Sequence, residues 1–245
     1  FSAHGVSKKV ETETNIRGLQ FHDATCPLVT KVHMEVIKHA RAERDIILIG
    51  HEGHPEVEGT MGRHTKSKNS KIYLVQDEKD AKSIKVNQPD NLALVTQTTL
   101  SVDDTKAIII ELRKRFPNLI TPKNDDICYA TQNRQDAVKQ LALENEFMIV
   151  VGSKNSSNSN RLKELSDRCG CEAVLIDEFN DLDLKKIKDI KKIAITAGAS
   201  APENRVQEIA ESIQIVTGGT ISEVGKDEEN IVFKMPPELR REKVQ

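Results

Sequence analysis

The chain contains two apolar runs that end in glycine, Ile46-Ile47-Leu48-Ile49-Gly50 and, 102 residues later, Met148-Ile149-Val150-Val151-Gly152. Such short runs are typical of strands that are buried on both faces of a parallel sheet. A second apolar strand is expected after each, at residues 92–95 and 193–195, with helical patterns in between. Alternation of strands and helices predicts α/β units with parallel sheets.

The same offset relates the residues that precede these runs. The two copies open with Asp23-Ala24-Thr25-Cys26 and Asp125-Asp126-Ile127-Cys128, and a helical stretch follows each. Within these stretches Val36 corresponds to Val138. A repeat of this length indicates that each copy is one structural unit.

The first residues of the chain resemble the end of a further unit. We interpret residues 1–4 as the last strand of that unit, whose own cysteine would then lie roughly 60–80 residues upstream of Phe1. We therefore expect three similar parallel-sheet α/β units in a pseudo-threefold arrangement around a central cluster, the first of them truncated. The expected boundaries are residues 1–25 for the remnant, 26–124 and 125–212 for the complete units, and 213–245 for a tail that packs on the first unit and contains a strand at 230–234.

The composition narrows the class of protein. Of the 245 residues, 37% are hydrophobic and 30% are charged, as in a soluble globular protein. No run of about 18 apolar residues occurs, so no membrane span is expected. The net charge of −2 argues against a nucleic-acid binder. The 4 cysteines are too few for a disulfide scaffold and favour a reducing compartment.

Cys26 and Cys128 occupy equivalent repeat positions directly before a helical stretch. Helix N-termini favour thiolates, and thiolates ligate iron–sulfur clusters. Three repeats would supply three thiolates and leave one iron of a cubane cluster open. Zinc is the competing metal, although the paired Cys-x-x-Cys spacing of zinc sites is missing. Cys169 and Cys171 lie at the far end of a helix and are expected to be structural.

Histidines and a glutamate cluster after the first strand, in His51-Glu52-Gly53-His54-Pro55-Glu56. Ligands of parallel sheets collect at such strand ends. A glutamate beside histidine suits proton delivery, and the alternative is an acid that stabilises a helix dipole. His33 and His39, on the helix after Cys26, are expected to lie on the surface.

The segment from Gly152 to Asn160 is rich in serine and asparagine where a strand enters a helix. Small donors together with helix N–H groups can hold phosphate oxygens. An ordinary helix N-cap is the alternative, but one cap residue would suffice for it. Ser200, at the neighbouring strand end, could add another donor. The segment therefore predicts a diphosphate site.

Long motifs across essentially the whole chain resemble one known family. They are Asp23-Ala24-Thr25-Cys26-Pro27-Leu28-Val29-Thr30-Lys31-Val32-His33, Gly50-His51-Glu52-Gly53-His54-Pro55-Glu56-Val57-Glu58-Gly59, Thr96-Gln97-Thr98-Thr99-Leu100-Ser101, Asp126-Ile127-Cys128-Tyr129-Ala130-Thr131, residues 151–162 and Thr196-Ala197-Gly198-Ala199-Ser200-Ala201-Pro202. Through them the sequence resembles the LytB family of 4-hydroxy-3-methylbut-2-enyl diphosphate reductases.

The resemblance implies specific roles for residues of this chain. Cys26 and Cys128 would be two of three ligands of a [4Fe–4S] cluster, with the third cysteine and another active-site histidine upstream of Phe1. Glu56 would deliver a proton with the help of Thr98. The substrate-binding residues that it implies are His4, His54, Gln97, Thr98, Ser156, Ser157, Asn158 and Ser200.

The resemblance also implies an activity. The family converts its substrate to isopentenyl and dimethylallyl diphosphates by two-electron reductive dehydroxylation, the last step of the non-mevalonate isoprenoid pathway. A ferredoxin or flavodoxin supplies the electrons, in the bacterial cytoplasm or in plastids. The chain by itself is expected to be inactive. The alternative is a non-redox binding or hydrolytic α/β protein in which Cys26 or Cys128 is a nucleophile.

Overall fold

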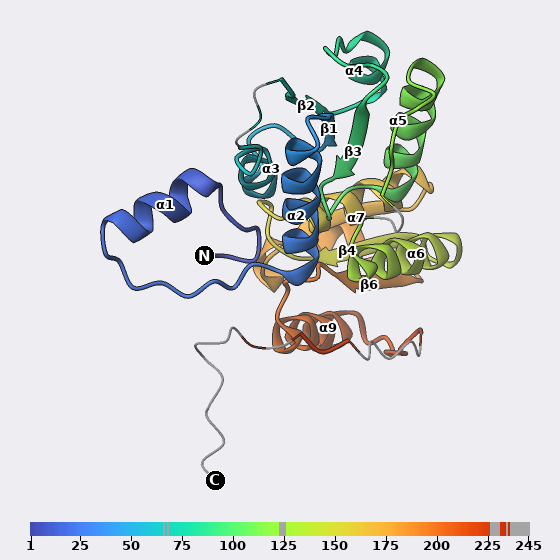
Figure 1. Cartoon of the computed structure of the whole chain (residues 1–245). Coiled ribbons are helices and arrows are strands. Elements are labelled where there is room, and N and C mark those ends of the chain that lie inside the picture. The colour runs from blue at the N-terminus through green and yellow to red at the C-terminus, as the bar shows by residue number, and fades with distance from the viewer. Residues whose placement is uncertain (66, 68, 123–125, 226–230, 234, 236–245) are drawn as a thin grey trace. The chain divides into compact units, whose positions relative to one another are not determined.

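A computed structural model describes residues 1–65, 67, 69–122, 126–225, 231–233 and 235 (Figure 1). The chain divides into two compact units. Unit 1 is built mainly from Phe1–Thr98 and Val102–Ile127, and unit 2 from Thr99–Ser101 and Cys128–Glu229. The described helices lack the combination of length and apolar composition that a membrane-crossing helix requires.

Unit 1 contains a three-stranded parallel sheet in the order β2-β1-β3. Its strands are β1 (Asp45–Ile49), β2 (Ile72–Val75) and β3 (Leu92–Thr96). Its helices are α1 (Lys8–Ile16), α2 (Pro27–Arg41), α3 (Pro55–Met61), α4 (Glu78–Ser83) and α5 (Val102–Arg115). The two strands that the sequence predicts here, β1 and β3, are neighbours, which brings their carboxyl ends to one edge of the sheet.

Unit 2 contains a second parallel sheet with the equivalent order, β5-β4-β6. Its strands are β4 (Phe147–Val151), β5 (Glu172–Ile176) and β6 (Ile193–Ala197). Its helices are α6 (Tyr129–Glu144), α7 (Ser157–Arg168), the 3₁₀ turn η1 (Phe179–Asp181), α8 (Leu184–Ile187) and α9 (Glu203–Thr217). In both sheets the strand that comes first in the chain lies in the middle, so the parallel α/β fold expected from the repeat is confirmed.

Helices cover both faces of the apolar central strand β4. In β4, Met148 and Val150 pack with residues of α6 and α7, whereas Phe147, Ile149 and Val151 pack with residues of α9. Burial of each such side chain stabilises the fold by roughly 1.5–3 kcal/mol. The equivalent helix positions Val36 and Val138 are both fully buried, as the repeat predicts.

Asp45 fixes the start of β1 although it is a buried charge. Its Oδ1 accepts a hydrogen bond from the backbone N–H of Lys71 at 2.8 Å. Its Oδ2 accepts bonds from the N–H groups of Asn87 at 2.8 Å and Gln88 at 2.9 Å and from the Tyr73 hydroxyl at 3.2 Å. A buried carboxylate is stable only with such partners. The network ties β2 and the loop before β3 to the central strand.

Two expected strands are not found. Residues 1–4 form coil and a turn. Among the described residues, the N–H groups of Ala24 and Cys26 donate to the carbonyls of Phe1 and Ala3, and the Phe1 amino group donates to the carbonyl of His22, but these bonds do not form a strand ladder. Residues 231–233 are also coil, while 230, 234 and Asp125 of the second Asp-x-x-Cys motif lie outside the described residues. The pseudo-threefold arrangement and the boundaries 1–25, 26–124, 125–212 and 213–245 stay predictions.

Candidate active site

Gln97 joins the two strand ends of unit 1. It follows β3, is 1% exposed, and donates its backbone N–H to the carbonyl of Ile49 at 2.8 Å. Its side-chain Oε1 accepts the backbone N–H of His51 at 3.1 Å. The loop after β1 is therefore fixed to the loop after β3, as expected at the carboxyl edge of a parallel sheet.

Glu56 and Thr98 form a buried pair at this edge. Glu56 is in the first turn of α3 and is 1% exposed. Its Oε1 accepts the Thr98 backbone N–H at 2.6 Å, and its Oε2 accepts the Thr98 hydroxyl at 3.0 Å. The carboxylate therefore bonds another segment rather than its own helix.

This environment changes the acidity of Glu56. Burial raises its pKa to about 7, the two bonds from Thr98 oppose that rise, and the negative charge of Asp126 adds to it. A carboxyl group with a pKa near neutrality can both hold and release a proton at physiological pH.

His4 and His54 lie together beside Glu56 in the same unit. His54 precedes α3, and its Nδ1 accepts the backbone N–H of Glu56 at 3.2 Å. This bond assigns the remaining proton of the neutral ring to Nε2. Burial, with the nearby His4 and His51, lowers the pKa of His54 to about 4. The His4 ring packs edge-on against it, with 5.4 Å between ring centroids. A neutral His54 is a hydrogen-bond donor and not a fixed cation.

Cys26 and Cys128 have the same local geometry, as their repeat positions predict. Each directly precedes a helix, with φ −55° and ψ 133° at Cys26 and φ −60° and ψ 133° at Cys128. Both thiols are half-buried and free, and neither forms a capping hydrogen bond. Two uncommitted thiols at helix N-termini fit the donor set of a thiolate-bound cluster. Within the described residues no group of three His, Cys, Asp or Glu could hold a metal by itself.

The other two cysteines do not share this geometry. Cys171 is 1% exposed and packs in the core of unit 2. Cys169 is exposed at the C-terminal end of α7. The burial of Cys171 agrees with the structural role expected for it, whereas the exposure of Cys169 does not.

The polar loop after β4 uses several of its residues to stabilise itself. The Ser156 hydroxyl caps α7 by accepting the N–H of Ser159 at 3.3 Å. Ser153 accepts the N–H of Asn155 at 3.2 Å. The Asn160 amide donates to the carbonyl of Ser156 at 2.8 Å. These residues therefore cap α7 and stabilise the loop, as the N-cap alternative predicts.

Asn158 has a different environment in the same loop. Its side chain is buried, and within the described residues neither Oδ1 nor Nδ2 has a hydrogen-bond partner. Leaving such groups unsatisfied costs about 1–3 kcal/mol each, so the site favours a bound polar group. Ser157 lies beside it and accepts a bond from the Thr99 hydroxyl at 3.4 Å. Ser200 is exposed in the turn after β6, the strand next to β4.

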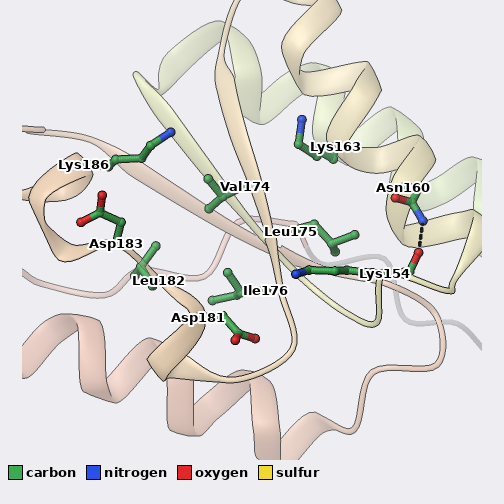
Figure 2. Close-up of a pocket in the computed structure, with 10 residues that line it drawn as sticks. All are labelled: Lys154, Asn160, Lys163, Val174, Leu175, Ile176, Asp181, Leu182, Asp183 and Lys186. Atoms are coloured by element: carbon green, nitrogen blue, oxygen red, sulfur yellow. Dashed lines mark hydrogen bonds between the residues drawn. The ribbon is translucent and has the colours of Figure 1, made fainter.

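A pocket of about 420 Å³ lies elsewhere in unit 2 (Figure 2). Its walls include the β5 residues Val174, Leu175 and Ile176. It shares Lys154 and Asn160 with the polar loop but is lined by none of the predicted site residues.

Two histidines expected on the surface are buried. His33 is 4% and His39 is 6% exposed, on the same face of α2 as Val32 and Val36. Burial, with a nearby arginine in each case, lowers the pKa of both to about 4. The expectation was wrong because histidine is polar by type, whereas helix periodicity places both positions on the buried stripe.

Asp126 belongs to the site but received no role from the sequence. Its side chain is fully buried, with Oδ1 3.0 Å from Nζ of Lys31 and Oδ2 accepting the backbone N–H of Thr96 at 3.2 Å. Its charge also raises the pKa of Glu56. The sequence feature that could have indicated a role for Asp126 is its position two residues before Cys128.

A family model described as LytB protein matches residues 1–214. The chain belongs to the LytB family. Relatives named 4-hydroxy-3-methylbut-2-enyl diphosphate reductase include one from Alcanivorax borkumensis, 58% identical over 98% of this chain and 77% of its own length. Another, from Saccharophagus degradans, is 56% identical over the same shares. The LytB family is therefore an oxidoreductase family.

A solved structure agrees with this membership. The E-1-hydroxy-2-methyl-but-2-enyl-4-diphosphate reductase from Plasmodium falciparum superimposes with a TM-score of 0.90 at 36% identity, covering 97% of this chain and 74% of that one. Another reductase structure, described as the terminal enzyme of the non-mevalonate pathway, gives a TM-score of 0.55 at 30% identity. The fold of this LytB chain is thus the fold of known reductases.

Proposed function

We propose that this chain serves the reduction of 4-hydroxy-3-methylbut-2-enyl diphosphate to isopentenyl and dimethylallyl diphosphates. The reaction takes up two electrons and two protons, breaks the C–O bond of the 4-hydroxyl group and releases water. The observation that carries the proposal is the buried Glu56 carboxyl, whose pKa of about 7 suits a proton donor to the departing oxygen. The names of the relatives supply the substrate.

Thr98 completes the proton path. When Glu56 is ionised, the Thr98 hydroxyl donates to its Oε2. When the carboxyl is protonated at Oε2, that bond reverses, and the hydroxyl proton of Thr98 becomes free to pass onward. The pair can therefore move one proton without moving either backbone.

We propose diphosphate-binding residues within each unit. His4 and His54 of unit 1 offer ring N–H groups, and Gln97 holds the loop that carries His54. In unit 2 the donors are Ser156, Ser157, Asn158 and Ser200, together with the backbone N–H groups at the start of α7. Asn158 supports this assignment most directly, because its buried amide has no protein partner among the described residues.

Cys26 and Cys128 would be two of the thiolate ligands of a [4Fe–4S] cluster. When bound, such a cluster supplies electrons and a Lewis-acidic iron. A ferredoxin- or flavodoxin-type carrier would deliver the electrons, in a bacterial cytoplasm or a plastid. Both thiols point to this role because neither is used by its own helix.

Cysteine variants of the full-length protein, purified anaerobically, test the proposal. Cys26→Ser and Cys128→Ser are expected to lose iron, acid-labile sulfide and reductase activity. Cys169→Ser is the matched control, because this thiol is exposed at the end of α7, and it should keep all three. Unmutated full-length protein that stays free of iron after anaerobic reconstitution would refute the cluster. If alkylating Cys26 or Cys128 in iron-free protein stopped a phosphatase activity, the hydrolytic alternative would hold.

A further inference from the structure

His4 lies in a turn that is tied to the Cys26 backbone. The N–H of Gly5 donates to the carbonyl of Ser2 at 3.0 Å and closes the turn. The N–H of Cys26 donates to the carbonyl of Ala3 at 3.0 Å. The accepting carbonyl belongs to the peptide bond between Ala3 and His4, so this hydrogen bond fixes the backbone directly before the His4 side chain.

Gly5 is packed too tightly to carry a side chain. Its φ is +71°, a region that favours glycine. A Cβ at this position would lie 2.6 Å from Cε1 of His33 and 3.0 Å from Cγ2 of Thr25. The buried His33 ring thus supports the turn from the side of α2.

Helix α3 supports the same segment through two glycines. A Cβ at Gly59 would lie 3.2 Å from the carbonyl oxygen of Gly5 and 3.4 Å from the N–H nitrogen of Val6. A Cβ at Gly62 would lie 2.2 Å from Cβ of Ser7. The absence of side chains on this face lets the segment lie directly against the helix that carries Glu56.

The His33 ring is buried beside the turn of Gly5. Its side chain is 4% exposed, and Nε2 has no hydrogen-bond partner among the described residues. Its ring contacts Gly5, next to His4, whereas His39 lies at the other end of α2. The contact of the His33 ring with Gly5, rather than a hydrogen bond of Nε2, therefore indicates its role.

We propose that His33, Gly5 and Gly59 are positioning residues that hold His4 edge-on against His54 and so shape the diphosphate site. This inference rests on the proposed function, in which both rings contact the diphosphate. The two centroids are 5.4 Å apart, with the ring planes at 88°. Misplacing a group that binds the diphosphate weakens the binding of substrate and of inorganic diphosphate alike, which raises KM and Ki without a matching loss of kcat.

Gly5→Ala and Gly18→Ala, each made in the full-length reductase, form a matched pair that tests the inference. Gly18 has a similar φ of +62°, but a Cβ there would meet nothing within 4 Å. Both glycines have a positive φ that strains an alanine, so the difference between the variants reports mainly on the contact with the turn. Gly5→Ala should raise KM and the Ki of inorganic diphosphate by roughly tenfold to a hundredfold, with kcat and iron content much less affected. Gly18→Ala should leave KM and Ki unchanged.

A second set of variants covers the possibility that Gly5→Ala folds poorly. His33→Ala should raise KM and Ki, whereas His39→Ala, an equally buried ring, should change the thermal midpoint but neither constant. In the His33→Ala background the further effect of Gly5→Ala should shrink, because the ring that the new Cβ meets is gone. Unchanged KM and Ki in both Gly5→Ala and His33→Ala would overturn the inference.

His4→Ala separates this inference from the proposed function. A rise in Ki for His4→Ala, with no rise in the Gly5 and His33 variants, overturns the positioning role alone. No rise in His4→Ala overturns the assignment of His4 to the diphosphate and the inference with it.

Discussion

Replacement of Glu56 by glutamine should make the protein more stable at alkaline pH while removing its activity. The wild-type carboxyl has a pKa of about 7 in the folded protein against an ordinary value of 4.5. A raised carboxyl pKa means that ionisation opposes folding. The penalty is absent below the unfolded pKa, grows as the pH rises between the two values, and is constant above the folded one.

The size of the effect follows from this shift. Ionisation of Glu56 costs about 0.8 kcal/mol at about pH 5 and about 3.3 kcal/mol at about pH 8. Glutamine does not titrate, and its amide can keep both bonds to Thr98, one as acceptor and one as donor. The free energy of unfolding of Glu56→Gln relative to wild type should therefore rise by about 2.5 kcal/mol between these two pH values.

Urea unfolding of the iron-free protein, followed by far-UV circular dichroism, measures this difference. Wild type and variant are compared at each pH, so that contributions from all other titrating groups cancel. A stability difference that stays constant within about 0.5 kcal/mol from about pH 5 to about pH 8 would refute the raised pKa of Glu56. The holoenzyme variant should bind inorganic diphosphate normally but lose turnover, which separates the proton-transfer role from a binding role.

Three further predictions concern other parts of the molecule. Thr98→Val removes the hydrogen bond from the Thr98 hydroxyl that lowers the pKa of Glu56. The decrease of kcat at alkaline pH should therefore move to higher pH, and the maximal kcat should fall about tenfold or more. A pH–rate profile tests both effects. Asn158→Ala should lower the affinity for inorganic diphosphate by about tenfold or more in a calorimetric titration, since hydrogen bonds to charged groups contribute roughly 1.5–3 kcal/mol. Asn180 is exposed, so the control variant Asn180→Ala should bind inorganic diphosphate as wild type does. Asp45→Ala leaves three backbone N–H groups without their acceptor and should lower the free energy of unfolding by about 3 kcal/mol; a loss under 1 kcal/mol in urea unfolding would contradict the network.

The sequence was most informative where short-range patterns act. The runs at β1 and β4 are buried on both faces, as their composition requires. Cys26 and Cys128 lie at helix starts with nearly equal backbone angles, because the repeat preserves local conformation. The strand expected at residues 1–4 is missing, since a strand depends on a ladder partner that short-range patterns do not reveal.

Other features depend on contacts between segments that are distant in the chain. A glutamate beside histidine suggested proton transfer, but only the fold brings Glu56 to Thr98, 42 residues away, and buries the pair. The burial of His33 also depends on such a contact. Its polar side chain predicted a surface position, whereas the fold places the ring against the turn of Gly5.

The sequence by itself determined the repeat, the parallel sheets and the residue types of the site, because periodicity, composition and helix starts are local properties. The tertiary structure decided which of these residues act together. It raised the pKa of Glu56 by excluding water, and it left the Asn158 amide without a protein partner among the described residues. Solvent exclusion and hydrogen-bond satisfaction are set by the packing of distant segments, so no stretch of sequence contains them.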